Sequence, residues 1–219
     1  LDGELFGRVR DPDLPWTWYL NLLRRLKARF PDLHVHGFSP PEICHFARRF
    51  GKSLDAVLAE LIDAGLDSIP GGGAEILVDA VRREISPGKG TSAEWLAVMA
   101  AAHRRGLRTT ATMMFGHVET DAQRIEHLVA LRRLQDETGG FTAFICWPFQ
   151  PAGTALAAGA GGRLRLASAQ DYLRTVAMAR LVLDNVENLQ ASWVTQGPSL
   201  AQVALYFGAN DFGSLMIEE

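Results

Sequence analysis

The chain has 219 residues, 47% of them hydrophobic, and its 22 Lys and Arg nearly balance 25 Asp and Glu, for a formal net charge of −3. The sequence has no cluster of basic residues that would indicate nucleic-acid binding. Its apolar runs are too short to cross a bilayer. We expect no signal peptide, because the first residues are neither basic nor followed by an apolar stretch. The two cysteines, Cys44 and Cys146, form neither a disulfide framework nor a metal-ligand pair by spacing. We expect one cytoplasmic domain over residues 1–219.

Short apolar runs alternate with helices bounded by proline, glycine or capping residues. In the first half, the predicted elements are a helix over 16–30, a strand over 33–38, a helix from Ser53 to Gly65, a strand over 66–69 and a helix over 74–85. A helix from Thr91 to Gly106 and a strand over 107–115 follow. Thr91 and Thr120 each begin a capping-box pattern.

The second half repeats this alternation. The predicted elements are a helix from Thr120 to 139–140, a strand over 141–147, a Gly/Ala-rich loop over 152–162, a helix over 169–184, a strand over 189–194, a helix over 200–207 and a strand over 212–217. Helical crossovers between strands predict a parallel sheet.

Two architectures satisfy this pattern: a doubly wound open sheet and an eight-stranded α/β barrel of the TIM type. The barrel is favoured because polar residues end successive strands, where barrel enzymes place their chemistry. These residues are His36, Asp67, Ser68, His117, Glu119, Gln150 and Gln196. Six predicted strands are two short of closure. We therefore expect an incomplete parallel (β/α) barrel that lacks its first strands.

The glycine run Gly71–Gly73 is predicted to lie between a strand and a helix N-terminus. Free backbone N–H groups there can bind a phosphate or carboxylate, whereas the simpler interpretation is a turn that needs unusual backbone angles. The run matches neither the dinucleotide fingerprint nor the Walker pattern.

His34 and His36 lie two positions apart on a predicted strand and so face the same side. Both can approach a ligand or a metal, but two histidines without a carboxylate are thin evidence for zinc, and hydrogen-bonded barrel positions are the alternative. His117 follows a strand and is a candidate proton donor. Glu119 is explained equally well by the favourable field at a helix N-terminus.

The segment from Trp147 to Pro151, with two prolines and two aromatic residues, predicts either a rigid turn with packed rings or an aromatic wall against a flat substrate.

Four segments together resemble radical S-adenosylmethionine enzymes of the futalosine and deazaflavin group: Leu33–Ile43, Ala64–Leu77, Thr109–Thr120 and Leu134–Thr142. The resemblance covers nearly the whole chain from Asp13 onward. The triple glycine and the sequence of residues 115–120 favour the menaquinone-biosynthesis member of this group, which cyclises dehypoxanthine futalosine. Its relative, a subunit of deazaflavin (7,8-didemethyl-8-hydroxy-5-deazariboflavin) synthase, is the alternative.

The resemblance implies a [4Fe–4S] cluster on a Cys-x3-Cys-x2-Cys loop and an electron donor such as flavodoxin or ferredoxin. The cluster reduces S-adenosylmethionine, the resulting radical abstracts a ribose hydrogen, and the sugar radical adds to the benzoate ring; an electron and a proton then leave. This sequence has no such loop. We predict that it alone binds no cluster and performs no turnover. A cluster-free descendant kept as a binding or structural protein is a further alternative.

The resemblance also implies roles for particular positions. Contact with the cofactor is expected for Asp67, Ser68, Glu75, Met114 and Gly116. His36 and His117 are the candidate catalytic residues, for substrate contact or proton transfer. Substrate binding is expected for His34, Glu119 and Gln150. No metal ligand is predicted in this chain.

Overall fold

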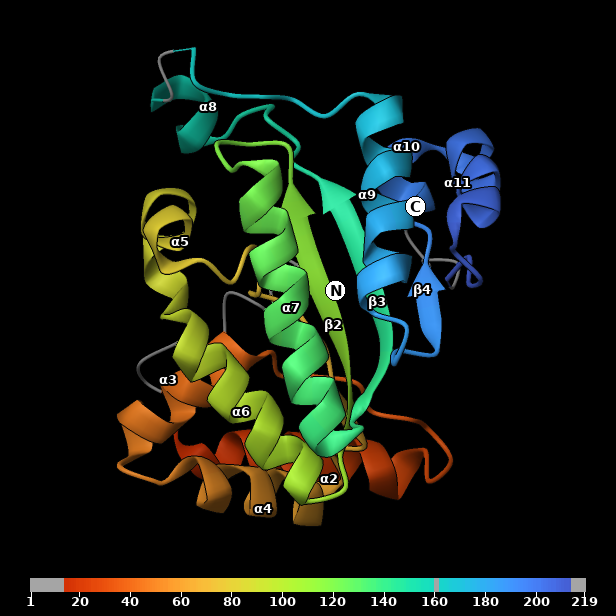
Figure 1. Ribbon diagram of the computed structural model, residues 1–219. Coiled ribbons are helices and arrows are strands. Elements are labelled where there is room, and N and C mark those ends of the chain that lie inside the picture. Colours follow the sequence, from red (N-terminus) through yellow and green to blue (C-terminus); the bar gives the residue numbers. More distant parts are fainter. Residues whose placement is uncertain (1–13, 160–161, 214–219) are drawn as a thin grey trace. The chain divides into compact units, whose positions relative to one another are not determined.

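A computed structural model describes residues 14–159 and 162–213, and these fall into two compact units (Figure 1). The first unit contains residues 14–73 and 93–109, and the second contains 74–92 together with the described residues from 110 onward. The prediction of a single domain stays a prediction.

The first unit is mainly helical. Its elements are α2 (Trp16–Arg29), α3 (Pro40–Phe50), α4 (Leu54–Ala64), β1 (Ser68–Ile69), most of α6 (Ser92–Arg104) and the start of β2 (Arg108–Phe115). Both α2 and α3 pack on α4, and aromatic rings fill the space between α2 and α3. The ring centroids of Tyr19 and Phe46 are 4.7 Å apart, and those of Trp16 and Phe46 are 5.3 Å apart.

Helix α3 is absent from the predicted elements, which pass from the strand over 33–38 to the helix that begins at Ser53. The structure shows why a helix begins at Pro40. Ser39 and Glu42 form a capping box, and Pro40 occupies the first helical turn, where a missing N–H costs nothing. Gly51 ends the helix in the left-handed conformation, with φ 61°.

The second unit places helices over strands. Its elements are α5 (Asp79–Ile85), η1 (Pro87–Lys89), the rest of β2, α7 (Asp121–Thr138), β3 (Phe141–Pro148), α8 (Ala155–Gly159), α9 (Ala169–Val182), β4 (Asn188–Gln190), α10 (Trp193–Gln196), α11 (Pro198–Ala204) and η2 (Leu205–Phe207). Helices α7 and α9 lie side by side on one face of β2 and β3 (Figure 1). Between these layers Phe115, Phe144 and Tyr172 are fully buried.

The strands form one parallel sheet in the order β1-β2-β3-β4. Ser68 and Ile69 pair with Arg108 and Thr109, while β4 pairs in parallel with β3. An isolated parallel bridge joins His36 to Ser68, and another joins Gln190 to Asp211. The predicted α/β class with parallel strands is thus confirmed, although the described residues form four strands where six were predicted. The incomplete (β/α) barrel stays a prediction.

Three predicted strands need correction. Residues 33–38 contribute only the bridge at His36, because Phe38 turns to φ 58° and the chain enters α3. The predicted strand over 189–194 is β4, which ends at Gln190 because α10 begins at Trp193. The last predicted strand shows one bridge, at Asp211, and its residues from 214 lie outside the described residues.

The predicted helix over 74–85 is also too long, since α5 begins only at Asp79. Glu75 takes φ 46°, which interrupts a right-handed helix, and its carbonyl accepts a 2.7 Å hydrogen bond from the Met114 N–H. Gly71–Gly73 therefore does not lead directly into a helix N-terminus. Gly73 has φ 77°, and a Cβ there would lie 2.4 Å from Pro41, so packing requires this glycine. Finally, the predicted loop over 152–162 contains the short helix α8.

Among the described residues, the longest and most apolar helices still fall short of what a membrane crossing needs.

Candidate functional site

Two polar clusters hold most of the predicted site residues, one in each unit. The first is the histidine–serine cluster, made of His34, Ser68 and His36. His34 Nε2 lies 2.7 Å and His36 Nδ1 lies 2.6 Å from the Ser68 hydroxyl oxygen. Ser68 is buried, whereas His34 and His36 are exposed. Their hydrogen bonds to Ser68 are part-buried. The prediction that the two imidazoles face the same side is confirmed.

Asp67 supports this cluster from the adjacent position. Its carboxylate accepts a 2.7 Å hydrogen bond from the Val35 N–H and forms a 2.5 Å ion pair with Lys27. Burial opposes ionisation, but the contacts with Lys27 and Val35 prevail and lower the pKa of Asp67. Asp67 thereby fixes the backbone between His34 and His36.

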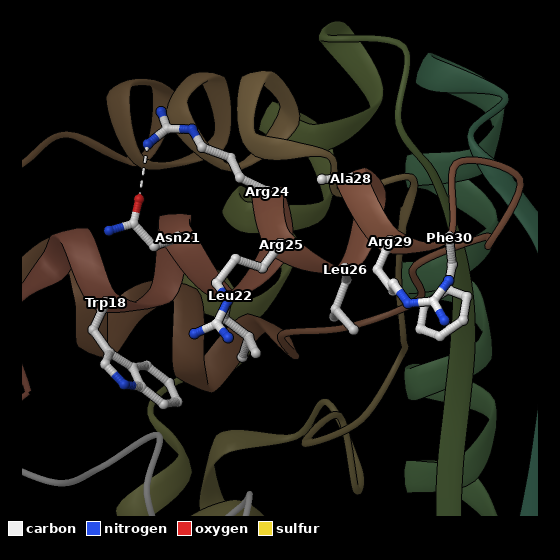
Figure 2. Close-up of a pocket in the computed structure, with 9 residues that line it drawn as sticks. All are labelled: Trp18, Asn21, Leu22, Arg24, Arg25, Leu26, Ala28, Arg29 and Phe30. Carbon is white, nitrogen blue, oxygen red and sulfur yellow. Dashed lines mark hydrogen bonds between the residues drawn. The ribbon is translucent and has the colours of Figure 1, made fainter.

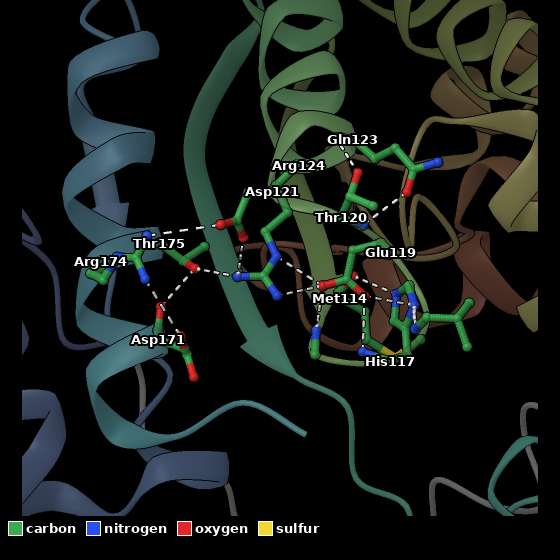
Figure 3. Close-up of polar contacts among 12 residues, drawn as sticks. Met114, His117, Glu119, Thr120, Asp121, Gln123, Arg124, Asp171, Arg174 and Thr175 are labelled. Carbon is green, nitrogen blue, oxygen red and sulfur yellow. Dashed lines mark hydrogen bonds and ion pairs between the residues drawn. The ribbon is translucent and has the colours of Figure 1, made fainter. Parts of the chain in front are cut away.

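The second cluster is the Glu119 network, made of Gly116, His117, Glu119 and Arg124 at the turn between β2 and α7 (Figure 3). Glu119 Oε1 accepts from the Gly116 N–H at 2.6 Å and lies 2.7 Å from Arg124 Nη2. Its Oε2 accepts from the His117 N–H at 2.9 Å and lies 2.9 Å from His117 Nδ1. The carboxylate is fully buried, and both of its oxygens are engaged.

The electrostatics of this network keep Glu119 ionised. Burial alone would raise the pKa of Glu119, but its contact with the His117 side chain and the backbone amides of Gly116 and His117 hold that pKa far below its ordinary range. His117 Nε2 faces the Met114 carbonyl oxygen at 3.1 Å, so this nitrogen carries a proton. The His117 side chain is fully buried and meets the Phe149 ring edge-on.

Sequence reasoning missed Arg124, which lies one turn into α7. Its guanidinium lies 4.8 Å from the centroid of the Phe115 ring and donates to the Thr175 hydroxyl at 3.3 Å, linking α7 to α9 (Figure 3). The spacing between Glu119 and Arg124 was the available signal, but a Glu before a helix and an Arg within it are common on exposed surfaces.

The other predicted cofactor residues in the second unit have local partners. Glu75 is buried and forms an ion pair with Lys89. Gly116 has φ 80°, and a Cβ there would lie 2.8 Å from the Cβ of Ala167, so its lack of a side chain serves packing. Met114 is half-buried. Contact of these residues with S-adenosylmethionine stays a prediction.

Two further features stand apart from both clusters. Gln150 is exposed, and its side-chain amide donates to the Pro148 carbonyl at 3.2 Å. A hollow of about 1110 Å³ lies beside α2, where Trp18, Leu22 and Leu26 share one side with arginines (Figure 2). Of the described residues that line it, none is a predicted site residue. The size of the hollow therefore does not indicate the location of the predicted site.

The cysteines do not fit a [4Fe–4S] cluster. The sequence contains only Cys44 and Cys146, and three thiolates are expected. Both are buried, and burial raises the pKa of Cys146 to about 12, which disfavours a thiolate. Within residues 14–159 and 162–213, no group of three or more His, Cys, Asp or Glu side chains is arranged to hold a metal ion.

Comparison with known protein families identifies the superfamily of this chain. Residues 9–131 match the Radical SAM superfamily, a span longer than half of the chain. The chain belongs to the radical SAM superfamily. Residues 138–219 match the CofH/MqnC C-terminal region, which places it in that branch of the superfamily and confirms the predicted resemblance. The superfamily consists of enzymes that use S-adenosylmethionine and a [4Fe–4S] cluster.

Curated relatives carry several names. A cyclic dehypoxanthine futalosine synthase of Halalkalibacterium halodurans is 46% identical over 95% of this chain and 55% of its own length. A 5-amino-6-(D-ribitylamino)uracil–L-tyrosine 4-hydroxyphenyl transferase of Methanosarcina barkeri is 43% identical over 95% of the chain and 56% of its own length. An aminodeoxyfutalosine synthase of Thermus thermophilus is 44% identical over the same two shares, 95% and 56%. The chain therefore spans about half the length of the curated relatives it matches.

A solved structure agrees with the fold. The crystal structure of methylornithine synthase matches with a TM-score of 0.64 at 15% identity, covering 94% of this chain and 52% of that chain. At this identity the likeness concerns the fold alone.

Proposed function

We propose that this chain is part of a radical S-adenosylmethionine enzyme that cyclises dehypoxanthine futalosine in menaquinone biosynthesis. The observation that carries the proposal is the 46% identity, across 95% of the chain, to a cyclic dehypoxanthine futalosine synthase. The glycine run and residues 115–120 support the same choice. In this proposal the parallel sheet belongs to a barrel completed by further strands, and the enzyme works in the cytoplasm with flavodoxin or ferredoxin as electron donor.

A second candidate is the deazaflavin-forming reaction. It is favoured by the 43% identity to the Methanosarcina barkeri transferase, whose name specifies a uracil and L-tyrosine as the reacting molecules. The difference of three percentage points in identity from the futalosine relative is small. A measurement of which substrate the chain binds is therefore needed to distinguish the two functions.

When bound in such an enzyme, S-adenosylmethionine supplies the radical that starts the reaction. Since this chain's cysteines do not fit the cluster, we assign only the roles of its own residues. His36 and His34, held by Ser68 and exposed, are suited to contact substrate and move a proton. His117 remains the second candidate catalytic residue. Its buried position suits it better to shaping the β2–α7 turn, together with Glu119, than to touching substrate.

The test is substrate binding by the 219-residue chain, measured by isothermal calorimetry. Binding of dehypoxanthine futalosine, without binding of L-tyrosine or 5-amino-6-(D-ribitylamino)uracil, is the expected result. The reverse preference would replace the proposal with the second candidate, and binding of none of these would overturn the assignment of a substrate cradle to this chain.

A companion measurement tests the missing cluster. We expect the chain, reconstituted with iron and sulfide, to show no cluster absorbance and no cleavage of S-adenosylmethionine. Restoring cluster-binding cysteines by fusing the corresponding segment of a relative is then expected to restore both. Cluster formation by the unmodified chain would contradict this expectation.

A further inference from the structure

The histidine–serine cluster joins two imidazoles through a single hydroxyl. Both distances to the Ser68 oxygen, 2.7 Å from His34 Nε2 and 2.6 Å from His36 Nδ1, are those of good hydrogen bonds. A serine hydroxyl has one proton to donate and lone pairs with which to accept. With neutral rings, therefore, one imidazole donates to Ser68 and Ser68 donates to the other.

This proton count allows two arrangements. In the first, His36 Nδ1–H donates to Ser68 and the Ser68 hydroxyl donates to His34 Nε2, so both rings carry their proton on Nδ1. In the second, His34 Nε2–H donates to Ser68 and Ser68 donates to His36 Nδ1, so both rings carry it on Nε2. The tautomers of the two histidines are thus linked through the hydroxyl.

We propose that His36, Ser68 and His34 form a proton relay that removes the proton lost by the substrate. The relay rests on the proposed function, in which cyclisation ends with loss of a proton. His36 Nε2 takes up that proton, the Nδ1 proton of His36 passes to Ser68, and the Ser68 proton passes to His34 Nε2. His34 Nδ1 then releases a proton to water. One proton enters, one leaves, and both rings change from the Nδ1–H to the Nε2–H tautomer.

The surrounding charges give the relay its direction. Burial, and then the neighbouring His34, lower the pKa of His36, so a proton captured there is readily passed on. Asp67 and Lys27, which form an ion pair with each other, are the charged groups beside the backbone of this cluster. Transfer from His36 toward His34 is therefore the favourable direction.

Nitrogen-15 NMR of the imidazole rings in the 219-residue chain tests the relay without any catalysis. At a pH where both rings are neutral, the expected result is matching tautomers for His34 and His36. Ser68→Ala should break the link and let each ring take its own solution preference. Ser68→Thr, which keeps the hydroxyl, should retain the link, and His45→Gln on α3 serves as a matched histidine control. Opposite tautomers in the unchanged chain would overturn the relay.

Kinetics of an enzyme form that contains the cluster-binding cysteines provide the second readout. His36→Gln is expected to lower kcat by about 100-fold, the lower range for loss of a general base. Ser68→Ala should also lower kcat and Ser68→Thr should restore it, with a solvent deuterium effect on product formation in the active forms. Equal rates for Ser68→Ala and the unchanged enzyme would contradict the relay. Absence of futalosine turnover by the unchanged enzyme would contradict the proposed function instead, while the NMR result would still decide the relay.

Discussion

The histidine–serine cluster and the Glu119 network both join histidines to polar partners near the sheet, but they differ in what they leave available. In the first, each imidazole uses one nitrogen on Ser68, and both residues are exposed. In the second, the carboxylate of Glu119 and the ring of His117 are fully buried and engaged on every side. A buried ion pair whose polar atoms all have partners stabilises a turn. Exposed histidines that each use one ring nitrogen on Ser68 can offer the other nitrogen for proton transfer.

The largest expected effect comes from breaking the Glu119 network. Glu119→Ala leaves the Arg124 guanidinium buried without its main counter-charge, a change that typically costs about 3–5 kcal/mol. Urea unfolding followed by circular dichroism measures this loss in the free energy of unfolding.

Asp121→Ala is the matched control, because Asp121 pairs with the same arginine at 3.5 Å but its side chain is 69% exposed. Its removal should cost about 0.5 kcal/mol. If Glu119→Ala destabilised the chain no more than Asp121→Ala does, the network would not be the stabilising element described above.

Acid should act mainly on buried histidines. His127 is fully buried, and burial, followed by the charge of Arg82, lowers its pKa to about 3 from an ordinary 6.5. The unfolded chain therefore binds a proton below pH 6.5 that the folded chain refuses until about pH 3. Stability is complete above pH 6.5 and falls by about 1.4 kcal/mol per pH unit from this group as the pH drops through that window.

The comparison of His127→Asn with the unchanged chain isolates this contribution. Asparagine keeps an acceptor for the Leu77 N–H, which now donates to His127 Nδ1 at 2.8 Å, but it does not titrate. The variant should be less stable at pH 7 and should lose less stability between pH 6.5 and 5. The same slope in both proteins would show that His127 is protonated in the folded chain.

Much of this architecture is readable from the sequence because it depends on local signals. The capping box at Thr120 and Gln123 begins α7, and Gly139 ends it with φ 62°, as predicted. The alternation of strands likewise placed His34 and His36 on one side.

The partners of these residues were not readable, because they come from distant positions. Lys27 reaches Asp67 across 40 positions, and Thr175 reaches Arg124 across 51. The helix over 74–85 failed for the same reason. Its first residues are held by Met114 and His127 rather than by one another.

A glycine at the Glu119 network can show how closely the β2–α7 turn is packed. Gly116 and Gly106 both have φ 80°, but a Cβ at Gly116 would lie 2.8 Å from Ala167, whereas nothing lies within 4 Å at Gly106. Gly106→Ala should cost about 1 kcal/mol from backbone strain alone. Gly116→Ala should cost roughly 1–3 kcal/mol more, because the added methyl overpacks the turn. Equal losses of stability in thermal unfolding would mean that Ala167 can shift to accommodate the added methyl group without cost.

The smallest effect is expected at the edge of the histidine–serine cluster. Lys27→Met keeps an unbranched stem beside Gly65 and removes the ammonium group that pairs with Asp67 and donates to the Leu33 carbonyl at 2.7 Å. For this part-buried pair the loss in the free energy of unfolding should be about 0.5–1 kcal/mol. Because the hydrogen bond and charge of Lys27 lower the pKa of Asp67, the pKa of this carboxyl group, followed by carbon-13 NMR, should rise in the variant. An unchanged Asp67 titration would show that Lys27 does not stabilise the ionised carboxylate.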